Sequence, residues 1–216
     1  MKHNSIFACV HCDSSFSEYT GRILDHHSEI TCLRRPFDDN PLMGNTKGFK
    51  KSERESVPNW FLNTKKHFDT KFFGITSIAR DALDMNFFKT GILIMRHPLC
   101  SWLIQRMNAL PKDGSLTLSA CHIEEFSKYC SANMPSILYW LHHSNLVIYY
   151  QDLLKEPTKM FNEIYKTIGA AEVMFLDDVK LPYDNPFEKI NNPEMIHVFL
   201  MNFPYKAQIP QDLELV

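Results

Sequence analysis

The sequence predicts an α/β fold in which a parallel sheet is flanked by helices on both faces. Short apolar segments at 6–10, 91–95 and 146–150 have the length and composition of buried strands. Segments with apolar residues at helical spacing lie between them, so helical crossovers join the strands and the strands run parallel. Ligands of such sheets bind at the carboxyl ends of the strands, beside the helix N-termini.

In the N-terminal half, the sequence predicts two further strands, one before and one after a long insertion. A helix is expected over 17–27 and a second strand over 29–33. Residues 34–66 then lose any periodicity and are rich in Pro, Asn, Gly and Lys, which predicts an insertion without regular structure. A third strand is predicted over 70–73, and an apolar stripe predicts a helix over 76–88.

The C-terminal half carries clear helix boundaries. Pro98 stands at a favoured first position for the helix that follows the central strand. Another helix is expected over 122–142, and the strand at 146–150 follows it. Asp152 is predicted to cap the next helix and Gly169 to end it. The expected organisation is an α/β domain over 1–180, with a tail over 181–216 that packs on it.

The composition limits the classes of partner. With 216 residues, 44% of them hydrophobic, the chain can bury one complete core. Its formal charge of −2 does not favour nucleic-acid binding. No apolar run reaches the roughly 20 residues of a membrane helix, and the first residues form no secretory signal. We therefore expect a cytoplasmic protein without a nucleic-acid or membrane partner; the sequence does not indicate an oligomeric state.

Three segments resemble the sulfotransferases that use 3′-phosphoadenosine-5′-phosphosulfate (PAPS). LIMRHPLCSWLIQRMN (93–108) is similar to the strand, Arg-x-Pro and helix of that family. NLVIYYQDLLKEPTKMFNEIYKTIGA (145–170) is similar to its later Tyr-Glu-Asp-Leu strand and helix. LDHHSEI (24–30) stands where members often have Leu-Asp-x-His-Pro-x-Ile. The resemblance spans roughly residues 5–170 and implies a sulfotransferase fold, which is related to that of the P-loop NTPases.

The resemblance implies transfer of a sulfuryl group from PAPS to a hydroxyl or amine of a small molecule or a glycan. The reaction would be an in-line displacement, with the phosphosulfate held by backbone amides at a helix N-terminus. In the family a Pro-Arg-Ser-Gly-Thr-Thr loop supplies these amides, and an ungapped count back from Leu24 places it over residues 13–18. The residues that the resemblance assigns to the donor are Ser14, Ser15, Phe16, Ser17 and Arg96.

This loop departs from the family pattern in charge and in shape. Ser14 replaces the basic residue and Phe16 the glycine, while Asp13 and Glu18 add two acids. We expect Phe16 to hinder the approach of an anion to the backbone, and the acids to repel it. A second hypothesis is therefore a degenerate, non-catalytic relative that keeps the fold as a binding or regulatory protein. In a third hypothesis, the cleft accepts another donor, and the acidic turn binds a cation instead of an anion.

Sulfuryl transfer also needs a base to accept the proton of the acceptor. His11 and Glu18 are the candidates near the loop, and His97 lies in the same neighbourhood. The Cys9-Val-His-Cys12 motif between strand and helix supports a lesser alternative, a thioredoxin-like redox protein. We predict no metal site, because no second pair of ligands accompanies these cysteines.

Overall fold

The computed structural model contains one parallel sheet covered by helices. The residues that it describes are 5–12, 14–34, 57–79, 87–111, 114–174, 185–213 and 215. The strands are β1 (Ser5–His11), β2 (Ile30–Arg34), β3 (Phe72–Ile78), β4 (Thr90–Met95) and β5 (Leu146–Tyr149). The helices are α1 (Ser14–Asp25), α2 (Val57–Lys65), α3 (Pro98–Met107), α4 (Ala120–His143), α5 (Tyr150–Lys155), α6 (Pro157–Ile168) and α7 (Met195–Met201), with the short 3₁₀ helix η3 (Pro186–Lys189).

The five strands lie in the order β2-β3-β1-β4-β5, and all neighbours pair in parallel. The chain passes from β1 to strands on one side, and then from β3 across to β4 on the other. This reversal places the topological switch point at the carboxyl ends of β1 and β4, where open α/β sheets form their ligand crevice. The predicted parallel sheet with helices on both faces is confirmed.

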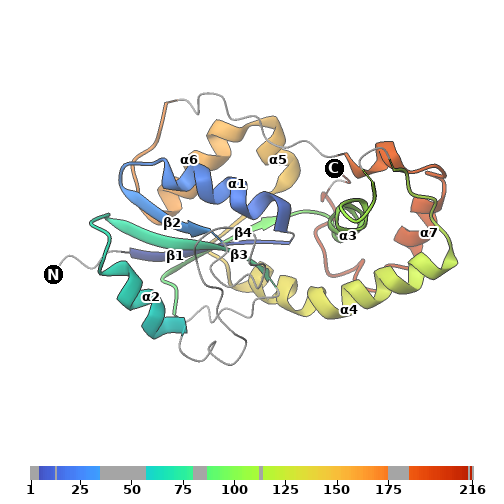
Figure 1. The fold of residues 1–216 in the computed structure, drawn as a ribbon, viewed down its shortest axis with the longest axis horizontal. Coiled ribbons are helices and arrows are strands. Elements are labelled where there is room, and N and C mark those ends of the chain that lie inside the picture. The colour runs from blue at the N-terminus through green and yellow to red at the C-terminus, as the bar shows by residue number, and fades with distance from the viewer. Residues whose placement is uncertain are drawn as a thin grey trace.

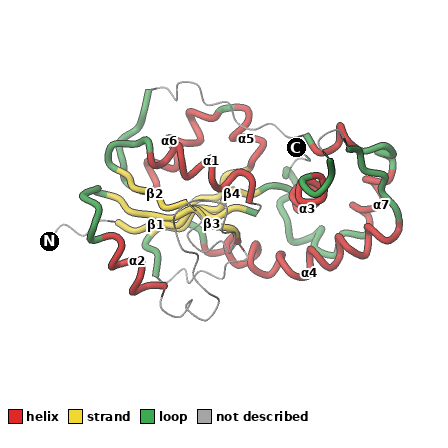
Figure 2. Tube along the Cα trace, viewed as in Figure 1, coloured by secondary structure: helices red, strands yellow, loops and turns green. Residues whose placement is uncertain are grey.

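Alternate side chains of the central strands enter two separate cores. Phe7 and Cys9 lie in the core beneath α1, α5 and α6, whereas Ala8 and Val10 lie in the core that α2, α3 and α4 cover. Figure 2 shows α1, α5 and α6 on one side of the yellow strands, and α2 and the end of α4 on the other. Gly74 on β3 permits this packing, because a Cβ there would lie 2.3 Å from the Phe7 ring.

A second part of the molecule extends beyond the carboxyl edge of the sheet and is formed by α3, the far half of α4 and α7 (Figure 1). Phe199, Phe203 and Leu213 from the C-terminal region are buried in the same core as α3 and α4. A hydrogen bond from Gln151 Nε2 to the Asp212 carbonyl, 2.7 Å long, ties the last described segment to α5. No described helix is both long and apolar enough to cross a bilayer.

Several predicted boundaries were wrong. The strand expected over 70–73 runs from Phe72 to Ile78, so the helix predicted over 76–88 does not form at its first three residues, and 80–86 lie outside the described residues. The insertion 34–66 begins inside β2 and contains α2, while 35–56 also lie outside the described residues.

The helix ends were predicted with mixed success. Pro98 occupies the first turn of α3 as expected, and Gly169 ends α6 at a φ of 91°. Asp152 does not cap a helix; it lies in the first turn of α5, whose N-cap is Tyr149. A break at Glu156 then separates α5 from α6, because Pro157 lacks the amide that would continue the helix.

Candidate functional site at the carboxyl edge of the sheet

The carboxyl ends of β1, β4 and β5 bring together residues that are distant in the sequence. His11 ends β1, Arg96 follows β4, and Tyr150 follows β5. Arg96 is buried, with 4% of its surface exposed, and its guanidinium carbon lies 4.2 Å from the centre of the Tyr150 ring. A cation above an aromatic face is stabilised by about 2 kcal/mol when desolvated. The arginine at the switch point is therefore held against Tyr150.

Phe16 connects α1 to this pair. Its ring centre lies 5.1 Å from that of Tyr150, with the planes at 86°, and 5.8 Å from that of His11, with the planes at 60°. Only 3% of Phe16 is exposed. The ring thus lies between His11 at the end of β1 and Tyr150 immediately after β5. We call His11, Phe16, Tyr150 and Arg96 the aromatic bridge.

The other residues assigned to the donor lie in the first turns of α1. Ser17 is fully buried, and the backbones of Ser14 and Ser15 begin the helix, although their side chains lie outside the described part of the structure. Phe16, which the sequence resemblance aligns with a glycine, packs its side chain into the core beneath α1. Its ring lies beside His11 and Tyr150 at the start of this helix.

The two predicted bases have different surroundings. His11 is buried beside Phe16, and its Nε2 lies 3.8 Å from the Cys9 sulfur. Glu18 instead faces β2: its carboxylate lies 2.5 Å from Arg22 Nη2 and 3.7 Å from Arg34 Nη1. The structure therefore places His11 beside Phe16, and directs Glu18 to an ion pair near the β2 edge of the sheet.

His97, the third histidine or acid named near the loop, has a structural role at the start of α3. It caps α3, because the Leu99 amide donates to its Nδ1 at 3.1 Å. Desolvation lowers the pKa of His97 to about 4, so the ring is neutral at pH 7. With Nδ1 as an acceptor, the proton of the neutral ring resides on Nε2. His97 is thus a hydrogen-bond donor. The sequence signal for this role is its position immediately before Pro98.

The two cysteines of the redox alternative, Cys9 and Cys12, are both buried. Cys9 contacts the core beneath α1 and Cys12 the core on the opposite face of the sheet. Burial raises the pKa of the Cys9 thiol well above its ordinary value, the reverse of what a reactive thiol needs. Among the described residues, no group of three or more His, Cys, Asp or Glu side chains forms a metal site. Asp13, the other acid of the proposed cation-binding turn, is outside those residues.

Comparison with known proteins identifies a related architecture. No protein-family profile matches the sequence, and a search of curated proteins finds no sequence relative. The structure is similar to the crystal structure of a sulfotransferase from Alicyclobacillus acidocaldarius, with a TM-score of 0.55 and 12% sequence identity over 96% of this chain and 95% of that one. At this identity the likeness shows a shared fold, so the chain has a sulfotransferase-like α/β fold.

Proposed function

We propose that this protein is a non-catalytic binding protein built on a sulfotransferase fold, in which the aromatic bridge takes the place of the bound phosphosulfate. The observation that supports the proposal is the buried Phe16 ring at the position of the family's glycine. Glycine permits an anion to approach the backbone closely, whereas a phenyl ring held against Tyr150 and His11 excludes it.

The electrostatics of the turn support the same proposal. The family's basic residue is Ser14 in this chain, and Glu18 follows shortly after it. The nearby cation, Arg96, lies over Tyr150 in a buried position. A donor carrying several negative charges would have to compete with Tyr150 for this guanidinium and would receive no second cation from the turn.

Sulfuryl transfer from PAPS to a hydroxyl or amine of a small molecule or glycan is the second candidate function. The position of Arg96 directly after β4 favours it, because the family resemblance assigns the 3′-phosphate of the donor to this arginine. Donor binding would require Phe16 to leave the core. Exposing such a ring costs about 2 kcal/mol, equivalent to about a 30-fold loss of affinity. Sulfuryl transfer thus requires a displacement of Phe16 that the non-catalytic binding function does not require.

Calorimetry with 3′-phosphoadenosine-5′-phosphate (PAP), the product that retains both phosphate groups, separates the two functions. The proposal expects no binding heat from the intact chain at millimolar ligand. Micromolar binding that Arg96→Ala abolishes would instead support the sulfotransferase. The matched control is Arg106→Ala on α3, since Arg106 pairs at the surface with Glu125 and should not affect PAP binding.

A further inference from the structure

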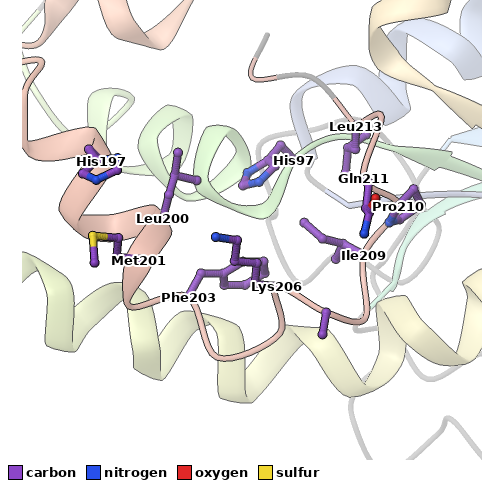
Figure 3. A pocket seen from close by; sticks show the side chains of 11 residues that line it. His97, His197, Leu200, Met201, Phe203, Lys206, Ile209, Pro210, Gln211 and Leu213 are labelled. Carbon is purple, nitrogen blue, oxygen red and sulfur yellow. The ribbon is translucent and has the colours of Figure 1, made fainter.

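A cavity of about 600 Å³ opens between the start of α3, the end of α7 and the chain segment that follows α7 (Figure 3). Small-molecule sites have volumes of about 300–1,000 Å³ and combine apolar walls with a few polar groups. Most of this wall is apolar, and its larger apolar side chains are Leu200, Met201, Phe203, Ile209, Pro210 and Leu213. The cavity therefore has the size and lining of a site for an organic molecule.

His97 places a hydrogen-bond donor in this cavity. Its ring lines the wall and is 5% exposed. Because Nδ1 accepts from the Leu99 amide, the Nε2–H group is the donor. Among the described residues, that amide is the ring's hydrogen-bond partner, and the Phe203 ring packs against it with centres 5.8 Å apart. A buried donor facing an open cavity is suited to an acceptor atom of a ligand.

Lys206 adds one positive charge to the same space. Figure 3 shows its side chain extending toward the region between Leu200 and His97. Among the described residues, those lining the cavity include no Asp or Glu, and no carboxylate forms an ion pair with Lys206. The N-terminus of the ten-residue helix α3 adds partial positive charge beside His97. The polar end of the cavity therefore favours a single negative charge.

We propose that this cavity binds an aliphatic carboxylate, with the carboxylate between His97 Nε2–H and the Lys206 ammonium and the hydrocarbon chain along the apolar wall. One lysine and one neutral donor match a monoanion better than a phosphate ester with two charges. The inference rests on the proposed function, because both describe a protein that acts by binding a ligand. The two sites use different residues and remain separable, because the aromatic bridge does not line the cavity.

Calorimetry with sodium octanoate and with 1-octanol on the full chain at pH 7 tests this inference. We expect saturable octanoate binding and at least about tenfold weaker binding of octanol, which lacks the charge. Lys206→Met should weaken octanoate about tenfold and leave octanol unchanged. Lys166→Met is the matched control, since Lys166 is exposed on α6, far from the cavity. Leu200→Trp, which fills the cavity, should abolish both interactions.

Two kinds of result would overturn the inference. Absence of saturable octanoate binding to the intact chain would remove the site itself. Equal affinity for octanoate and octanol, or octanoate binding that Lys206→Met leaves unchanged, would remove the proposed position of the carboxylate. Neither result depends on PAP, so failure of this site and failure of the proposed function are distinguished by the ligand and by the variants.

Discussion

The rings of Phe16 and Tyr150 meet edge to face, with centres 5.1 Å apart, and thereby join the first turn of α1 to the start of α5. The same tyrosine lies beneath the Arg96 guanidinium. A pair of this kind adds about 0.5–1.5 kcal/mol beyond the burial of its area. These contacts join residues that follow β4 and β5 to the first helix, at the edge of the sheet where the switch point lies.

Replacing Phe16 by alanine should therefore destabilise the protein as a core substitution does. We expect Phe16→Ala to lower the free energy of unfolding by about 3 kcal/mol, measured by urea titration. The control is Phe68→Ala, because Phe68 is 40% exposed and should lose less than about 1 kcal/mol. Equal small losses for the two variants would mean that Phe16 does not fill the crevice in solution.

The interaction between Arg96 and Tyr150 can be measured by a double-mutant cycle. Arg96→Met and Tyr150→Leu should show a coupling free energy of about 1–2 kcal/mol, because the pair is buried. The reference is Lys71 above the Phe72 ring, 5.0 Å away; this lysine is exposed to solvent, so the pair should couple by about 0.5 kcal/mol. Couplings of equal size would show that burial does not strengthen the Arg96 contact.

The parallel sheet could be predicted because its central strands are continuous apolar runs, and some helix ends because Pro98 and Gly169 have strong local preferences. The length of β3 could not be predicted. Thr76 and Ser77 are fully buried in the strand, although polar residues ordinarily indicate an exposed segment. Side chains of a strand point out of the sheet, so these hydroxyls are buried by elements that pack on its faces; Thr76, for example, lies opposite Gly21 of α1, a contact that the local sequence pattern does not contain.

The candidate site, like the fold, could be predicted only in part from the sequence. The sequence placed Phe16 at the family's glycine and indicated an obstruction, but did not identify Tyr150 as its partner. Glu18 was predicted as a base, although the four-residue spacing to Arg22 is typical of a helix-surface ion pair. The cavity beside His97 was not predictable, because it depends on packing against residues about a hundred positions later, such as Phe203.

The desolvation of His97 predicts an acid-sensitive component of stability. Its pKa falls from an ordinary value near 6.5 to about 4 in the folded protein, so the unfolded chain binds the extra proton first. Stability from this group is complete above about pH 6.5 and declines as the pH falls toward 4. We expect a loss of about 2.5 kcal/mol between pH 7 and pH 4.5, measured by urea unfolding.

The variant His97→Asn isolates this contribution. Asparagine can accept the Leu99 amide hydrogen bond as an N-cap but does not titrate. Between pH 7 and pH 4.5, the free energy of unfolding of this variant should therefore fall by about 2.5 kcal/mol less than that of the parent protein. His143→Asn is the control, since His143 is exposed at the end of α4. If His97→Asn and the parent protein had the same pH dependence, the neutral, buried state of His97 would be contradicted.

The six cysteines should differ sharply in reactivity, because Cys121 is exposed and the other five are buried. Desolvation raises the pKa of the Cys130 thiol to about 12 and that of Cys32 well above its ordinary value. Since only the thiolate reacts, a disulfide reagent such as DTNB should modify one thiol rapidly in the folded chain and all six in urea. Cys121→Ser should remove the fast phase. A fast phase of two thiols that persists in this variant and disappears in Cys9→Ser would instead support the thioredoxin-like alternative, because that activity needs an accessible, low-pKa pair.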